Sequence, residues 1–371
     1  MSKKISVILF ALIILLIPVA SLLSPYRSVS EQENRVLASF PVFNFEEFTS
    51  KRFMKGIDSF VSDHITCRDG WIALKADLVT LMGKRDNKGV YLGQNCLIQN
   101  IASPNPQIYR PNIDAISAFA KRTGKPTSLL LAPTAAEIER ARLPAFASTY
   151  DQSAFISLVG RKLSGVKLIN TVPALKAHSN QYIYYRTDHH WTTLGAYYAY
   201  AAAGTALGYT PLKRSSFNVE HASSNFNGTL YSTSGYRSIT PDVIDFYQPK
   251  SGSPLDRLVI GSGNSAKTYD SIYFKNMLSV KDQYSVFFDG NQAYEDIYTK
   301  SSGKSLLVIK DSYAHSLIPF LMNNYRRITM VDTRYLAQSL DETVNLKDYD
   351  QVLFVYNVDT FNTDTSIQNV N

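Results

Sequence analysis

Cysteine, histidine and charge are all scarce in this sequence. Two of the 371 residues are cysteines, Cys67 and Cys96, and their spacing matches no zinc or iron–sulfur pattern. The two thiols could pair outside the cytoplasm, but pairing depends on Cα geometry, and we expect them to be unpaired. Only 19% of the residues are charged and 45% are apolar. This composition argues against disorder and predicts one large domain plus a smaller appendage.

A dense run of lysine and arginine is also missing. The net charge of +7 suits nucleic acid, a membrane surface or an acidic polymer as a partner. Because no basic run is interleaved with stacking aromatics, nucleic acid is the least favoured of the three. The 24 tyrosines could line a carbohydrate groove, but tyrosine more often fills a core, and we favour the core.

The amino-terminal segment combines two early lysines with a long uncharged stretch. Lys3 and Lys4 precede Ile5–Leu23, which can just span a bilayer core of about 30 Å. The positive-inside rule then leaves the rest of the chain outside the cytoplasm. We predict a single-pass membrane anchor at residues 1–24. A cleaved signal peptide, giving a secreted protein, is the alternative, although Val19–Ser21 matches the cleavage pattern poorly.

Residues 25–104 read as a linker followed by an accessory region of helices and a strand pair. From 105 to 371, short apolar runs alternate with helical patterns, which favours an α/β sandwich with a mainly parallel sheet. Helices are expected at 45–64, 70–83, 111–124, 152–165 and 192–208, and strands at 89–99, 128–133, 166–170, 284–290, 304–310, 327–331 and 350–356. The stretch 209–300 is rich in Ser, Asn, Gly and Thr and predicts long loops.

Two of the 6 histidines stand together in the run Asp188–Trp191. In an extended segment residues i and i+2 face the same side, so Asp188 could orient His190 and leave its second nitrogen free as a base. That pair would form two thirds of a Ser-His-Asp triad. His189 would point the other way as a structural histidine, and Trp191 would form core or pocket wall.

The best candidate nucleophile follows an apolar strand. Leu306–Ile309 leads into Asp311 and Ser312, and a helix is expected from Tyr313. Ser312 would then sit at the carboxyl edge of the sheet, where backbone N–H groups and the helix dipole stabilise an oxyanion. Asp311 is expected to be a turn or cap residue.

A metal site is the competing interpretation of the same residues. Asp188, His189 and His190 could bind zinc or manganese together with His221 or His315. Neighbouring histidines in a strand diverge, however, and the sequence contains no HExxH motif. The serine mechanism is therefore favoured over metal catalysis.

The run "TDHHWTTLGA" resembles the signature of the DHHW family of exported bacterial proteins, which is similar to the SGNH-hydrolase-like alginate O-acetyltransferases. The resemblance continues in order along the chain, in "SEQENRVLASFP" (30–41), "GVYLGQNCLI" (89–98), "NGTLYSTSG" (227–235), "FFDGN" (287–291), "KDSYAHSLIPFL" (310–321), "VDTRY" (331–335) and "VLFVYNVDTF" (352–361). It implies a three-layer α/β/α sandwich of the SGNH type, with Asp188, His190 and Ser312 as the triad.

The same resemblance suggests further site residues. Gly290 and Asn291 would contribute to an oxyanion hole or to substrate contact, although a plain turn is the alternative. A last group would shape the pocket: Tyr313, Arg334 and Asn357. Family members carry Asn where this chain has His315, so that position departs from the pattern.

The sequence therefore predicts an extracytoplasmic O-acetyltransferase or acetylesterase that acts on a polysaccharide and needs no metal or diffusible cofactor. The resemblance implies an acetyl donor and a membrane-bound O-acyltransferase as partners. A non-catalytic protein that binds glycan or assembles a polysaccharide machine is the alternative. The sugar, the acetylated hydroxyl and the donor stay open.

Overall fold

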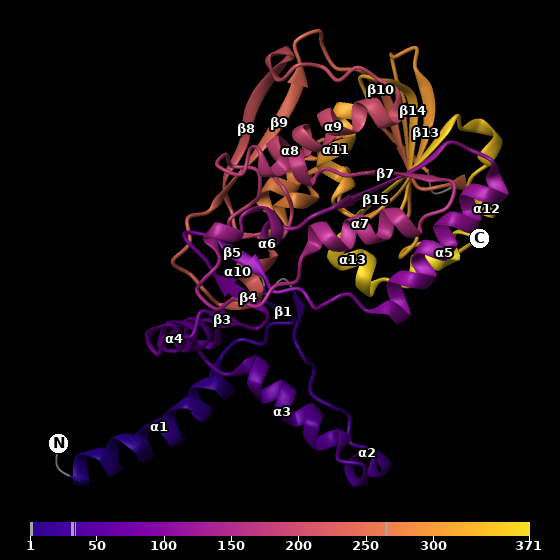
Figure 1. Cartoon of the computed structure of the whole chain (residues 1–371). Helices are drawn as coiled ribbons and strands as arrows, with labels where there is room; N and C mark the ends of the chain where they lie inside the picture. The colour runs from indigo at the N-terminus through magenta and orange to yellow at the C-terminus, as the bar shows by residue number, and fades with distance from the viewer. Residues whose placement is uncertain (1–2, 31–32, 34, 264–265) are drawn as a thin grey trace. The chain divides into compact units, whose positions relative to one another are not determined.

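A computed structural model describes residues 3–30, 33, 35–263 and 266–371 (Figure 1). The chain divides into two compact units. The smaller contains Met1–Lys88 and Tyr231–Ser238, and the larger contains Gly89–Leu230 and Ile239–Asn371. This division lies before the boundary near residue 104 that the sequence predicts, so the strand pair at 89–99 belongs to the larger unit. Three residues of the 30–41 segment, at 31, 32 and 34, lie outside the described residues.

The smaller unit begins with α1 (Lys3–Leu23), a helix long and apolar enough to cross a membrane, although a signal sequence meets the same criterion. It continues with β1 (Val29–Ser30), β2 (Arg35–Val36), α2 (Phe45–Thr49), α3 (Arg52–His64), α4 (Arg68–Leu81) and β3 (Asp86–Asn87). The single helical pattern expected at 45–64 is split into α2 and α3, because Lys51 takes the left-handed conformation, with φ 61°. Cys67 in this unit and Cys96 in the larger one are unpaired, as expected.

The larger unit is built on an eight-stranded mixed sheet in the order β11-β10-β12-β14-β13-β15-β6-β7. The five strands from β14 to β7 are parallel, and the other three pair antiparallel. The strands are β6 (Thr127–Ala132), β7 (Val166–Ile169), β10 (Leu255–Ile260), β11 (Lys267–Tyr269), β12 (Tyr294–Thr299), β13 (Lys304–Lys310), β14 (Tyr325–Val331) and β15 (Gln351–Asn357). β6 and β15 are buried along their whole length, which explains the apolar runs Leu129–Ala132 and Val352–Tyr356 within them. This confirms a mixed α/β fold with a large, mostly parallel region.

Helices flank this sheet in two groups (Figure 1). The helices of the larger unit are α5 (Pro106–Thr123), α6 (Ala135–Ile138), α7 (Gln152–Lys162), α8 (Val172–Lys176), α9 (Thr193–Leu207), α11 (Ala314–Leu321), α12 (Leu340–Thr343) and α13 (Val358–Thr363). α10 (Thr229–Ser234) begins in the larger unit and ends in the smaller one. α9 packs on α8 and α11, while α5 packs on α13. The predicted helix at 192–208 is capped by Thr192 at its start and by Gly208, with φ 77°, at its end.

Two expectations for the larger unit are wrong in part. The run 284–290 is not a strand: a 3-10 turn over Gln283–Val286 leads into three consecutive residues of positive φ, Phe288, Asp289 and Gly290. The stretch 209–300 is less irregular than expected, since it contains the antiparallel pair β8 (Phe217–Phe226) and β9 (Asp242–Pro249). The hairpin of β4 (Val90–Leu92) and β5 (Leu97–Gln99) forms as predicted.

Candidate active site

The Asp188–His190 segment is a tight loop and not an extended strand. An antiparallel bridge between Tyr184 and Trp191 closes the loop. Asp188 Oδ1 accepts a hydrogen bond from the backbone N–H of His190 at 3.0 Å, which fixes the turn. The expected alternation of side chains therefore fails, and the rings of His189 and His190 lie 4.0 Å apart.

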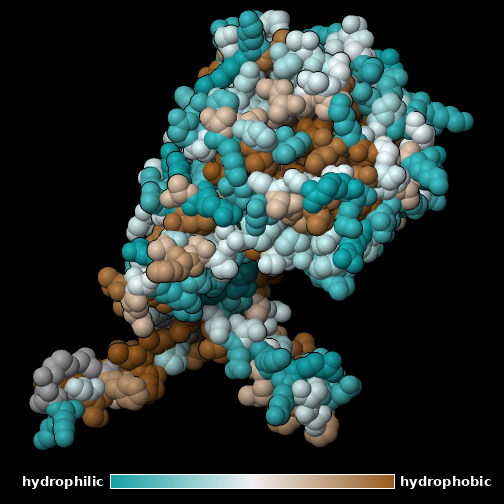
Figure 2. Space-filling model, in the orientation of Figure 1, coloured by the Kyte–Doolittle hydropathy of each residue, from teal (hydrophilic) through white to brown (hydrophobic). Residues whose placement is uncertain are grey.

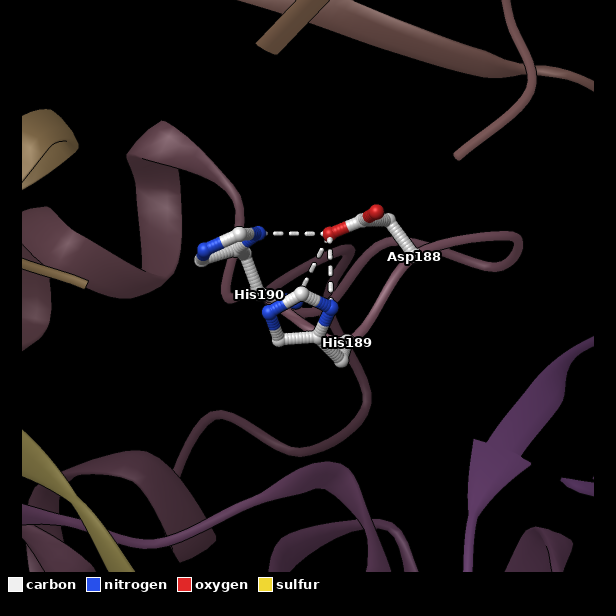
Figure 3. A group of neighbouring side chains, drawn as sticks. All are labelled: Asp188, His189 and His190. Carbon is white, nitrogen blue, oxygen red and sulfur yellow. Dashed lines mark hydrogen bonds and ion pairs between the residues drawn. The ribbon is translucent and has the colours of Figure 1, made fainter. Parts of the chain in front are cut away.

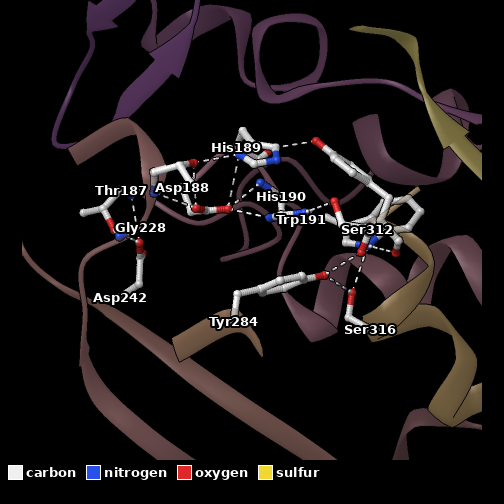
Figure 4. Close-up of polar contacts among 12 residues, drawn as sticks. Thr187, Asp188, His189, His190, Trp191, Gly228, Asp242, Tyr284, Ser312 and Ser316 are labelled. Carbon is white, nitrogen blue, oxygen red and sulfur yellow. Dashed lines mark hydrogen bonds and ion pairs between the residues drawn. The ribbon is translucent and has the colours of Figure 1, made fainter. Parts of the chain in front are cut away.

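The loop and the turn after β13 bring together the three residues expected to form a triad. His190 Nδ1 lies 2.6 Å from Asp188 Oδ1, and His190 Nε2 lies 2.7 Å from Ser312 Oγ (Figure 4). Asp188 and His190 are buried, while Ser312 is partly exposed. Both distances are within hydrogen-bond range, so the three groups form one continuous chain.

The carboxylate of Asp188 has partners on both oxygens. Oδ2 accepts from Thr229, from the backbone N–H at 2.8 Å and from the hydroxyl at 2.9 Å. A Cβ at Gly228 would overlap the Asp188 side chain, so glycine permits this close approach. Burial raises the pKa of Asp188, but His189, His190 and the hydrogen bonds outweigh it, and the net pKa lies well below its usual range. Asp188 is therefore an anion at neutral pH.

His189 supports the loop instead of facing away from it. Its Nδ1 lies 2.8 Å from the Thr229 hydroxyl, and its carbonyl accepts a hydrogen bond from the hydroxyl of Tyr313. Burial and the neighbouring His190 lower the pKa of His189 to about 4, although Asp188 acts in the opposite direction. His189 is therefore neutral at physiological pH.

Trp191 and Tyr284 hold the histidine against the serine turn. The buried indole of Trp191 donates to the carbonyl of Tyr313 at 3.1 Å and the hydroxyl of Ser316 at 3.0 Å. The ring of Tyr284 stacks on His190, with centroids 3.9 Å apart and planes 12° apart. The hydroxyl of Tyr284 donates to the carbonyl of Ser312 at 3.2 Å. Sequence reasoning missed Tyr284 and Thr229, because nothing local distinguishes them.

Asp311 fixes the turn that carries Ser312, as expected of a turn residue. Its Oδ1 accepts from the backbone N–H of Tyr313 at 2.9 Å. Its Oδ2 accepts from the side chain of Asn357 at 2.7 Å and from the backbone N–H of the same residue at 2.8 Å. Asn357, at the end of β15, therefore supports the nucleophile turn from the neighbouring strand.

Tyr313 lies beside the triad, and the other predicted residues have different surroundings. The ring of Tyr313 is fully buried, with its centroid 5.2 Å from that of His190. The guanidinium of Arg334 donates two hydrogen bonds to the Asp332 carboxylate, at 2.9 and 2.6 Å. Gly290 is buried in the positive-φ turn, while Asn291 is exposed. Within the described residues, neither Gly290, Asn291 nor Arg334 hydrogen-bonds to the Asp188–His190–Ser312 chain.

A metal would have to compete with this network. One ligand atom each from Asp188, His189 and His190 lies within 4.8 Å of the others (Figure 3). Asp188 and His190 already bond to each other through such atoms. The further predicted ligands lie elsewhere: exposed His221 bonds to Asp245 at 2.6 Å, and buried His315 lies 2.5 Å from Lys310 Nζ. The described chain thus supplies three donors at this place, and neither His221 nor His315 joins them.

The sequence profile described as DHHW protein matches residues 33–128 and 121–331. The chain belongs to the DHHW family. No sequence among the curated proteins matches it.

Several solved structures are similar to that of this DHHW protein. A DHHW family protein from Eubacterium siraeum is 23% identical with TM-score 0.65, covering 76% of this chain and 95% of that one. Bacillus cereus PatB1 with a sulfonyl adduct is 19% identical with TM-score 0.64, covering 75% of this chain and 97% of that one. The O-acetyltransferase domain of Pseudomonas putida AlgJ is more distant, at 15% identity and TM-score 0.47, covering 74% and 93%. The first two likenesses place the chain in the same mixed α/β fold.

Proposed function

We propose that this protein is an extracytoplasmic O-acetyltransferase or acetylesterase that modifies an exopolysaccharide or cell-wall glycan through an acylated Ser312. The observation that carries the proposal is the hydrogen-bonded chain from Asp188 through His190 to Ser312 Oγ. The proposed framework is a three-layer sandwich of the SGNH type over 105–371. The proposed location is the membrane surface, with α1 as an anchor.

The geometry supports a two-step acyl transfer. Ser312 Oγ attacks the carbonyl carbon of an acetyl donor while His190 Nε2 takes the hydroxyl proton, and Asp188 stabilises the resulting imidazolium. The leaving alcohol receives that proton from His190, and the acetyl group stays on Ser312. A sugar hydroxyl or water then attacks the acetyl carbon, gives its proton to His190, and releases Ser312, which recovers the proton.

The oxyanion formed in each step needs hydrogen-bond donors. The backbone N–H of Ser312 has no acceptor within the described chain, so it is available next to Oγ. It lies beside the first turn of α11, where the helix dipole favours negative charge. Gly290 and Asn291 are proposed as further donors, and the side chain of Asn291 is exposed.

Two further points support this assignment. PatB1, which shares the fold, was solved with a sulfonyl adduct, and sulfonylating reagents react with activated nucleophiles such as serine hydroxyls. The sequence also carries DHHW-family segments from about residue 30 to 361, and that family resembles the alginate O-acetyltransferases. On this basis we propose a polysaccharide acceptor and a membrane-bound O-acyltransferase as donor partner.

Hydrolysis of an aryl acetate tests the nucleophile. Ser312→Ala should lose activity at least about 10³-fold while its circular dichroism spectrum stays unchanged. A sulfonyl fluoride should add mass to Ser312 in the wild type, as located by peptide mass spectrometry. Activity retained in Ser312→Ala would overturn the triad, and loss of wild-type activity with EDTA would favour the metal interpretation.

Acceptor oligosaccharides distinguish transfer from hydrolysis. If added oligosaccharide becomes acetylated at the expense of free acetate, the protein is a transferase; if acetate alone forms, it is an esterase. Polymer binding that survives Ser312→Ala, with no turnover of any ester, would instead indicate a non-catalytic glycan-binding protein.

A further inference from the structure

The smaller unit exposes apolar side chains along one stripe of α4. Trp71, Leu74, Leu78 and Leu81 recur at helical spacing, so they lie on one face, and each is exposed. Met82 extends the stripe, and Leu81 and Met82 are 82% and 85% exposed. A contiguous exposed apolar face of this kind marks an interaction surface and not a core.

A second exposed apolar group lies on α2, the segment before it and α3. Its members are Phe40, Val42, Phe43, Phe45, Phe48, Met54 and Val61, all exposed. Phe43 packs against the rings of Phe48 and Phe53, at centroid distances of 6.0 and 5.3 Å. These rings contact one another but are not covered, so the group is a formed aromatic surface.

Hydrogen bonds connect the α4 stripe to the end of α1, and a ring stack connects the end of α3 to the segment that follows α1. The backbone N–H of Thr66 donates to Ser21 Oγ at 2.9 Å, and the indole of Trp71 donates to the carbonyl of Thr66 at 3.1 Å. His64, at the end of α3, stacks on Tyr26 at 5.0 Å. An apolar groove of about 610 Å³ runs between the end of α1 and α3. The α4 stripe therefore begins where the membrane-length helix ends, and the aromatic group lies at the other end of α3.

We infer that α2, α3 and α4 form a platform that lies in the interface of a lipid bilayer, with the α4 stripe and the aromatic group inserted between headgroups and acyl chains. Amphipathic helices take this position when one face is apolar and aromatic, and tryptophan is enriched at that depth. The inference takes α1 as a retained anchor, as in the proposed function. Apolar surface continues along α1 at the lower left of Figure 2.

The net charge of the platform indicates which lipids it can bind. Residues 40–88 contain 8 Lys and Arg against 7 Asp and Glu, a net charge of +1. Attraction to anionic headgroups is therefore small, and burial of apolar area has to provide the binding. The platform should accordingly insert into bilayers of zwitterionic lipid, with little dependence on salt.

The two tryptophans allow a direct test in the intact protein. Trp191 is fully buried and Trp71 is exposed, so lipid quenchers report on Trp71. We would reconstitute the full chain into phosphatidylcholine vesicles that carry bromine either near the headgroup end or near the end of the acyl chains. We expect about twofold quenching by the shallow bromines and less by the deep ones, since interfacial helices sit about 5–10 Å into the boundary. Trp71→Phe should remove the quenching.

Charged substitutions on the stripe provide the decisive comparison. Leu74→Glu together with Leu78→Glu should abolish quenching of Trp71 while α1 keeps the protein resistant to carbonate extraction. The matched control is Val219→Glu on β8, an exposed apolar position in the larger unit, which should leave quenching unchanged. If the lipid bromines do not quench Trp71 in wild-type protein that resists carbonate extraction, the inference is wrong. This holds whether or not cross-linking shows that the exposed faces pair in a dimer. Esterase activity on a soluble aryl acetate should be the same in all these variants, so failure of the platform and failure of the proposed function can be distinguished.

Discussion

The two compact units place their apolar side chains in opposite ways. In the larger unit Leu306, Leu307 and Phe354 are fully buried in one continuous core. In the smaller unit Leu81 and Met82, at the end of α4, are almost fully exposed. The larger unit therefore has a complete core of its own, whereas the smaller unit leaves apolar side chains exposed.

The largest expected effect falls on the active site of the larger unit. Asp188→Asn should lower kcat/KM for an aryl acetate about 10⁴-fold, because an amide no longer fixes the imidazole tautomer or stabilises its positive charge. Asp256→Asn, at an exposed position, is the matched control and should have no effect. A fall of less than tenfold for Asp188→Asn would contradict the assigned role.

A pair of leucines tests the contrast between the units directly. Leu307→Ala should lower the free energy of unfolding by about 2–5 kcal/mol, because it leaves a cavity in the sheet core. Leu81→Ala should change it by less than about 0.5 kcal/mol in detergent, since that side chain is exposed. Equal effects in urea titrations would show that the smaller unit is covered in solution.

The pH dependence of stability should reveal the buried histidine loop. His189 has a folded pKa of about 4, below its unfolded value near 6.5, so the unfolded state binds more protons between these values. The contribution of His189 to stability should be constant above about pH 6.5 and fall by roughly 3 kcal/mol as the pH drops to 4. His189→Gln should lose this component in chemical denaturation at each pH. Parallel pH profiles of the two proteins would contradict the assigned environment.

The smallest effect is expected at Tyr284. Tyr284→Phe keeps the ring stacked on His190 and removes the hydrogen bonds of the hydroxyl to the Ser312 carbonyl and to Ser316 Oγ, so kcat should fall by roughly fivefold. Tyr284→Leu also removes the stacking and should lower kcat further and shift the pH profile, with KM little changed. If both variants matched the wild type, Tyr284 would have no positioning role.

Local sequence patterns were enough to predict many of the helices and strands. Periodicity and caps predicted α9, with Thr192 and Gly208 at its ends, and apolar runs predicted the buried parallel strands β13 and β15. The prediction of a strand at 284–290 was wrong because the aromatic residues of this run are buried in a turn. A buried turn can have the same apolar composition as a strand. The antiparallel pair β8–β9 was missed because its polar sequence suggested loops.

The catalytic residues could be predicted because they stand in short stretches of sequence whose chemistry is easy to recognise. Asp188, His190 and Ser312 are conspicuous, and the structure brings them within hydrogen-bond range. The direction of His189 was wrong, since a loop with bends does not follow strand alternation. Tyr284 and Thr229 reach the site only through tertiary contacts, so no local pattern could indicate them.

The spacing of the triad also has a consequence for folding. Asp188 and His190 lie two residues apart and can meet in a local loop, whereas His190 and Ser312 are separated by 122 residues. Contacts of such long sequence separation form late, because the intervening chain must first be ordered. Recovery of esterase activity during refolding should therefore lag behind recovery of helical structure, and it would report the completion of the larger unit.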